Sequence, residues 1–257
     1  MHTKTSPDGT GDFSDFIDEA AKKGINEIGF SEHLFDRPAH PTDFMDGYVQ
    51  DFLETKKTSA IPIKLGAEID FFPAEIDTVE EFLRKYPFDY VIGSVHYLDN
   101  WPIDSRSQMQ EYFRRDILQV YKDYFEAVRK LCRTRLFDIL GHVDIVKIFG
   151  FKPDWDITSI LEETADAIAA SNMCVEINTA GLIRKCAEIY PSRQLLEMLK
   201  DRNVPITLGS DAHRPQDVGR SFDKAFELSK QVGLTHLCVF EARRRSLVKI
   251  QDQEAFC

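Results

Sequence analysis

Short apolar runs alternate along the chain with longer segments in which apolar residues recur every three or four positions. The first such segment extends from Phe13 to Lys23, and Gly24 follows it, which predicts an amphipathic helix. The same periodicity predicts helices at residues 43–59, 74–85, 108–133, 159–171, 192–201 and 221–231. The short runs predict strands at residues 27–30, 63–69, 90–95, 137–140, 174–177, 206–208 and 236–240.

This repeated alternation of strand and helix favours a parallel sheet. Seven units in 257 residues average about 37 residues each, which is typical of a β/α barrel. An open doubly wound sheet is the alternative, but no G-x-G-x-x-G follows any predicted strand. Because no linker or change of composition marks a boundary, we expect a single domain over residues 1–257.

Charge narrows the classes of partner. Lys plus Arg number 32 against 43 Asp plus Glu, a net charge of −11, which disfavours binding to nucleic acid or to an anionic membrane surface. No apolar run approaches 18 residues, and none stands at the amino end, so we expect neither a membrane helix nor a signal peptide. Five scattered cysteines without a C-x-x-C pair indicate reduced thiols and a cytoplasmic location. Nothing in the pattern indicates an oligomeric state.

Histidines fall at the carboxyl ends of predicted strands. Four of the seven histidines do so: His33, His96, His142 and His213. Two further strands end in polar residues, one in Glu68 and Asp70 and the other in Asn178. His2 stands at the start of the chain, whereas His40 and His236 lack such a context. Strand ends of a β/α barrel converge on one face. So many nitrogen and oxygen donors suit more than one Zn, Mn or Fe ion.

At these positions the sequence resembles the PHP superfamily, which is named for polymerase and histidinol phosphatase domains. The resemblance covers nearly the whole chain and is closest to the histidinol-phosphate phosphatase branch. It rests on His-Thr-Lys-Thr-Ser-Pro-Asp-Gly (2–9), Glu-His (32–33), a strand ending at Glu68, Gly-Ser-x-His (93–96), Gly-His-x-Asp (141–144), Glu-Ile-Asn-Thr (176–179), Tyr-Pro-Ser (190–192) and Ser-Asp-Ala-His (210–213). The fold implied is α/β, a distorted (β/α)7 barrel.

The resemblance also implies three metal sites. Their ligand sets are His2, Glu68 and Asp211 for the first ion; Glu68, His96 and His142 for the second; and Asp8, His33 and His213 for the third. The family motif is His-x-His, and its first histidine would precede Met1. We therefore expect the first site to lack one ligand and the first strand to be truncated. Asp8, in Pro-Asp-Gly, fits a turn equally well.

The reaction implied is metal-dependent hydrolysis of L-histidinol phosphate to L-histidinol and phosphate, in histidine biosynthesis. A hydroxide bridging two metal ions would attack phosphorus, with Glu68, Asp211 and His213 as catalytic residues. The proton donor to the leaving group stays open between a metal-bound water, His213 and Asp211. Candidate substrate-binding residues are Arg184, Lys147, Ser94, Asn178 and Trp101, with Arg37 and Arg214 as weaker cations.

Three other functions remain open at this point. The first alternative is a phosphoesterase on the same scaffold that acts on another small phosphate ester, such as a nucleotide or a sugar phosphate. A truncated first motif would also suit an inactive metal-binding remnant. An amidohydrolase-like barrel acting on C–N bonds is the third alternative, but a carboxylated-lysine signature is missing.

Overall fold

Six strands form one parallel sheet in a computed structural model that describes residues 1–35 and 42–250. Their order in the sheet follows their order in the chain: β1 (Ile28–Leu34), β2 (Ile63–Asp70), β3 (Tyr90–Ser94), β6 (Ile139–Leu140), β7 (Cys174–Asn178) and β8 (Ile206–Gly209). Each β/α crossover therefore steps to the neighbouring strand, as it does in a barrel. All six strands lie where the apolar runs predict them.

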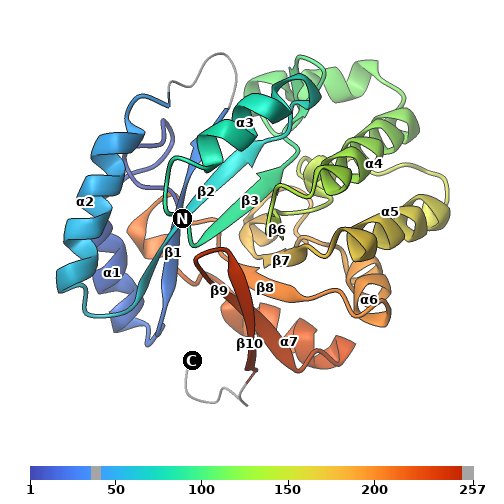
Figure 1. Cartoon of the computed structure of the whole chain (residues 1–257). Helices are drawn as coiled ribbons and strands as arrows, with labels where there is room; N and C mark the ends of the chain where they lie inside the picture. The colour runs from blue at the N-terminus through green and yellow to red at the C-terminus, as the bar shows by residue number, and fades with distance from the viewer. Residues whose placement is uncertain (36–41, 251–257) are drawn as a thin grey trace.

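Helices surround the outer side of this sheet (Figure 1). They are α1 (Phe13–Lys22), α2 (Met45–Thr58), α3 (Ile76–Leu83), α4 (Ile117–Thr134), α5 (Thr158–Ser171), α6 (Arg193–Asp201) and α7 (Phe222–Val232). The predicted helix at 108–133 is divided into a 3₁₀ segment, Arg106–Arg114, and α4. The division falls there because the Asp116 carboxylate accepts a hydrogen bond from the Leu118 amide and caps α4.

The prediction that the seventh strand, at 236–240, joins the parallel sheet is wrong, although a strand does form there. It forms β9 (His236–Glu241), which pairs antiparallel with β10 (Arg244–Lys249) in a separate hairpin. The two turn residues, Ala242 and Arg243, have φ of 46° and 63°, as a type I′ turn requires. The Asp89 carboxylate accepts from the Ala242 amide at 3.1 Å, and this bond holds the turn against the sheet.

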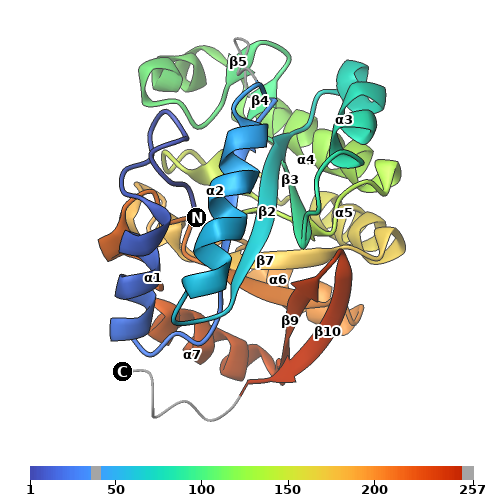
Figure 2. The same cartoon turned by 60° about the vertical axis from the view of Figure 1, so that its left-hand side comes forward.

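The β9–β10 hairpin lies at the end of the molecule opposite a second, short hairpin, β4 (Tyr97–Leu98) with β5 (Trp101–Pro102) (Figure 2). Buried side chains of β9 pack against the amino-end residues of the parallel strands. This group, which we call the basal cluster, consists of Tyr90, Ile92, Ile139, Cys174, Cys238 and Phe240. The hairpin therefore closes the amino end of the curved sheet with apolar contacts.

The first two residues bridge the two edges of the sheet, β1 and β8. The Ser31 amide of β1 donates to the Met1 carbonyl at 2.9 Å, and the His2 amide donates to the carbonyl of Ala212, beyond β8, also at 2.9 Å. Behind them lies a cavity of about 280 Å³, lined by both edge strands, α7 and the hairpin. Among the described residues, none of the helices combines the length and apolarity that crossing a membrane demands.

Candidate metal centre

The strand ends bring the predicted ligands to one rim of the sheet. Glu68 lies near the end of β2, while His96 and His142 come two residues after β3 and β6. His33 is the second-last residue of β1. Asp211 and His213 follow β8. Parallel strands therefore supply residues distant in sequence to one face.

The ligand group predicted for the second ion consists of Glu68, His96 and His142, all buried. His142 Nε2 lies 3.0 Å from Glu68 Oε1 and 3.0 Å from His96 Nε2, while His96 Nε2 lies 3.7 Å from Glu68 Oε1. A tetrahedral ion with bonds of about 2.0–2.1 Å spaces its ligand atoms about 3.3 Å apart. The three side chains thus have the spacing of three corners of such a site.

The ligand group predicted for the first ion shares Glu68 with that set and adds His2 and Asp211. His2 Nε2 lies 3.2 Å from Asp211 Oδ1 and 3.4 Å from Glu68 Oε2. The two oxygens of Glu68 therefore face different groups of ligands. A carboxylate in this position is suited to bridge two cations.

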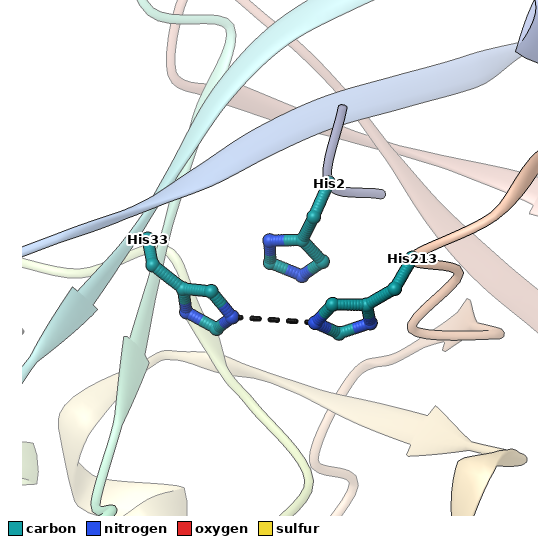
Figure 3. Close-up of side chains that lie close together, drawn as sticks. All are labelled: His2, His33 and His213. Atoms are coloured by element: carbon teal, nitrogen blue, oxygen red, sulfur yellow. Dashed lines mark hydrogen bonds between the residues drawn. The ribbon is translucent and has the colours of Figure 1, made fainter. Parts of the chain in front are cut away.

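The third ligand group contains the three histidines of Figure 3: His2, His33 and His213. The His2 ring stacks on those of His33 and His213, with centroids 4.1 and 4.3 Å apart. His33 Nε2 and His213 Nε2 lie 3.5 Å apart. Asp8 joins this group from the amino-terminal loop, with Oδ2 3.2 Å from His213 Nε2.

The donor set fits divalent cations. Two Nε2 atoms that face each other, as in His96 and His142, need a proton or a metal ion between them. Buried Nδ1 atoms of His2 and His142 have no hydrogen-bond partner among the described residues. Asp70 accepts from His96 Nδ1 at 2.6 Å and leaves the Nε2 lone pair for a metal ion.

The histidines and carboxylates of the cluster shift one another's pKa values strongly. Burial disfavours the charged forms, but hydrogen bonds to Asp211 and Glu68 outweigh it and raise the pKa of His2 to about 9. Burial and the charge of His2 together lower the pKa of His33 to about 3. Against the effect of burial, neighbouring histidines hold the pKa of Glu68 and of Asp211 well below the usual range. Both carboxylates are therefore ionised at neutral pH.

Two buried glutamates beside the ligands were not predicted as site residues. Glu176 accepts from the His142 amide at 3.1 Å and from Asn178 Nδ2 at 2.9 Å. Glu32 accepts three hydrogen bonds from the amino-terminal loop. Both glutamates stand inside the sequence motifs, but their residue type alone does not distinguish a support from a ligand.

Most of the predicted substrate-binding residues bond to other parts of the protein. Ser94 Oγ donates to Glu68 at 2.7 Å, and Asn178 bonds to Glu176. The buried Lys147 ammonium contacts Asp144, Glu188 and the Ile189 carbonyl. Trp101 is buried, with its ring 4.7 Å from that of Tyr112 and the Arg115 guanidinium over it.

Arg184 lies exposed after the 3₁₀ segment Ala180–Ile183 that follows β7. Arg214, directly after His213, is also exposed. Arg37 and His40 lie outside the described residues. Arg184 thus differs from Lys147, whose charge is already matched by buried and half-buried carboxylates.

Taken together, a parallel β/α half-barrel and three overlapping clusters of histidine and carboxylate ligands define a class of metal-binding barrel proteins. Comparison with known proteins specifies the family. A model of the PHP domain matches residues 1–180. The chain belongs to the PHP domain family.

Two curated relatives cover most of the chain. A probable histidinol-phosphatase of Deinococcus radiodurans is 32% identical, over 91% of this chain and 92% of the relative. The histidinol-phosphatase of Bacillus subtilis is 27% identical, over 88% and 97%. The crystal structure of histidinol phosphate phosphatase from Lactococcus lactis, complexed with zinc, L-histidinol and phosphate, matches with a TM-score of 0.81 at 24% identity, covering 96% and 97%. This last likeness confirms the distorted PHP barrel.

Proposed function

We propose that this protein hydrolyses L-histidinol phosphate to L-histidinol and phosphate, as a metal-dependent phosphoric monoester hydrolase. The observation that carries the proposal is the convergence of three ligand groups that share His2 and Glu68. Support comes from the two relatives, which are named histidinol-phosphatase or probable histidinol-phosphatase and which this chain matches over nearly their whole length. We propose that the whole chain works as one domain, in the cytoplasm, on a small phosphate ester and not on nucleic acid or membranes.

The three ligand groups provide for two to three divalent ions, with zinc as the first choice and manganese or iron as alternatives. The first ion would be held by His2, Glu68 and Asp211, the second by Glu68, His96 and His142, and the third by Asp8, His33 and His213. When bound, such ions activate water as a nucleophile and neutralise phosphoryl oxygens. No covalent intermediate on the protein is needed.

The protein's own groups hold the donors in the required protonation state. His213 Nδ1 bonds to the Asp211 carbonyl oxygen at 3.0 Å, so that proton stays on Nδ1 and Nε2 faces the site. The Asp70 carboxylate fixes His96 in the same way. Ser94 donates to Glu68 and orients that carboxylate. Because Asp211 is ionised at neutral pH, it would serve as a ligand, and the proton for the departing alkoxide would come from a metal-bound water or from His213.

We propose that Arg184 receives the phosphate, because it is exposed and follows β7, whose carboxyl end supplies Asn178. Lys147 acts at one remove, since its three contacts tie the loop after β6 to the loop after β7. Ser94, Asn178 and Trp101 bond to or pack against other side chains, so we propose that they support the site and do not bind the substrate directly.

The test joins two measurements on one purified sample: metal per chain by elemental analysis, and phosphate release. We expect two to three metals, and faster release from histidinol phosphate than from a nucleoside monophosphate or a sugar phosphate. Preference for one of those two esters would assign a different substrate. A sample with full metal and no phosphate release would contradict the proposal, and the inactive remnant would then hold.

A further inference from the structure

Glu32 is a buried carboxylate next to a metal-ligand candidate, yet it points to a different partner. Its exposed fraction is 1%, and it accepts from the Thr3 amide at 3.0 and 3.2 Å and from Ser6 Oγ at 2.5 Å. A buried carboxylate is costly unless hydrogen bonds compensate for the lost water. The hydrogen bonds described come from the Thr3 amide and the Ser6 hydroxyl of one loop, residues 3–9. The Tyr48 phenol also lies near the carboxylate, because burial and the charge of Glu32 raise the pKa of that phenol.

That loop is fixed at two places and carries Asp8 between them. At one end Glu32 holds Thr3 and Ser6, and Ser6 Oγ also accepts from the His33 amide at 3.3 Å. At the other end the Thr10 amide donates to the His213 carbonyl at 2.8 Å. Within the loop the Gly9 amide donates to the Ser6 carbonyl at 3.1 Å. The position of Asp8 therefore depends on both anchors.

Glycine at position 9 shows how tightly the loop closes on itself. A Cβ added there would lie 2.0 Å from the Thr3 carbonyl oxygen, which no side chain tolerates. The loop is thus compact, and a change at the Thr3 end is transmitted to Asp8 rather than absorbed by slack chain.

We infer that Glu32 is a positioning residue, whose carboxylate holds the loop at residues 3–9 so that Asp8 reaches the His33–His213 pair. This inference rests on the proposed function for the identity of the third metal site. Charge-assisted bonds from a backbone amide and a hydroxyl make the anchor stronger than neutral bonds would. Glu32 itself touches neither a metal ion nor the substrate.

The first test uses metal-free protein and amide hydrogen exchange, comparing wild type with Glu32→Gln. We expect the Thr3 amide to exchange at least about tenfold faster in the variant, because it loses a charged acceptor. Exchange in the strands of the parallel sheet should stay unchanged. Equal protection of Thr3 in both proteins would overturn the inference, whatever the activity shows.

The second test counts metal per chain after loading with zinc. Glu32→Gln should lose one ion, as Asp8→Asn should, and should retain the ion held by Glu68, His96 and His142. A full metal count in Glu32→Gln, beside a loss in Asp8→Asn, would contradict the inference. If wild type itself fails on histidinol phosphate, the proposed function fails, but the exchange test still judges Glu32.

Two further variants separate positioning from general stability. Ser6→Ala removes one donor to Glu32 and leaves the buried charge in place, so it should weaken zinc binding in the same direction but less. It decides the matter if Glu32→Gln unfolds. Glu27→Gln is the matched control, because Glu27 precedes the other end of β1 and pairs with Lys64 at 3.7 Å. It should change neither readout.

Discussion

The two ends of the same parallel sheet are buried to a similar degree but with opposite chemistry. At the carboxyl ends, buried side chains are ionisable, with Glu68, His96 and His142 within 4 Å of one another. At the amino ends, the basal cluster is closed by apolar packing of β9. Strand β3 takes part in both, since Tyr90 and Ile92 belong to the basal cluster and His96 follows its far end.

The difference separates stability from chemistry along each strand. Apolar side chains stabilise the fold without partners, whereas buried charges cost free energy until a counter-ion or hydrogen bond compensates. The buried charges of the rim therefore destabilise the fold until a cation binds. The apolar contacts of the basal cluster contribute stability that helps to offset this cost. Changes at the two ends should give opposite patterns of activity and stability.

The largest effect is expected at Glu68, the carboxylate shared by two ligand groups. Glu68→Gln should lower kcat/KM by about 10³-fold and reduce the metal content, because several kcal/mol of charge stabilisation is lost. The thermal midpoint of the metal-free variant should not fall. Asp77→Asn, on the exposed surface of α3, is the control. Full activity in Glu68→Gln would remove the shared carboxylate from the reaction.

The reverse pattern is expected at Phe240 in the basal cluster. Phe240→Ala should lower the free energy of unfolding by about 3 kcal/mol, because it leaves a cavity under the sheet. Metal content and kcat per folded molecule should be unchanged. Leu247→Ala, at an exposed position of β10, should shift stability by less than about 0.5 kcal/mol. A selective loss of activity in Phe240→Ala would show that the two ends are coupled.

Protonation distinguishes the two ends as well. With its pKa raised to about 9, His2 carries a proton in the metal-free protein at pH 7. Its stabilising pairs with Asp211 and Glu68 are complete below its unfolded pKa, near 6.5, and are lost as pH rises through 9. Zinc must displace this proton, so zinc affinity should increase as pH rises from 6 to 9.

Calorimetry of zinc binding in two buffers of different ionisation enthalpy measures that proton release. His2→Gln should release about one proton fewer at pH 7. An unchanged proton count would show that His2 is already neutral in the metal-free protein.

The smallest effect is expected at Arg184, which is exposed. Arg184→Ala should raise the KM for histidinol phosphate roughly fivefold and lower kcat modestly, with metal content unchanged, since an exposed charge contributes about 1 kcal/mol. Arg133→Ala, an exposed arginine on α4, is the matched control. If kcat/KM stays at the wild-type value, Arg184 has no part in the site.

Much of the sheet and of the rim follows from local sequence. Short apolar runs locate six parallel strands, and patterns of period 3.6 locate the helices between them. The convergence of the strand ends then groups histidines that are far apart in the chain. Pairing is a different matter. The apolar run at 236–240 resembles the other strands, and its partner β10 exposes all six residues, so no burial pattern marks it. The antiparallel hairpin depends on a turn that is held by Asp89, 153 positions earlier in the chain, and no local sequence pattern marks that contact.

Side-chain partners across loops are equally hidden from the sequence. The ammonium of Lys147 is directed by Glu188 and the Ile189 carbonyl, which belong to a loop about forty residues later. Trp101 packs on Tyr112, beyond a turn whose shape the local pattern does not specify. Residue type and distance from a strand end predicted which side chains reach the rim, but not which ones remain available to a substrate.

The bridging position of Met1 has a practical consequence for anyone preparing the protein. Its amino group lies 3.3 Å from the Gly29 carbonyl oxygen and from Ser31 Oγ, one residue from the ligand candidate His2. An affinity tag fused there would replace the ammonium with an amide and direct linker residues toward the cavity between β1 and β8. Metal counts and rates should therefore be compared between proteins that differ only in the residues joined to Met1.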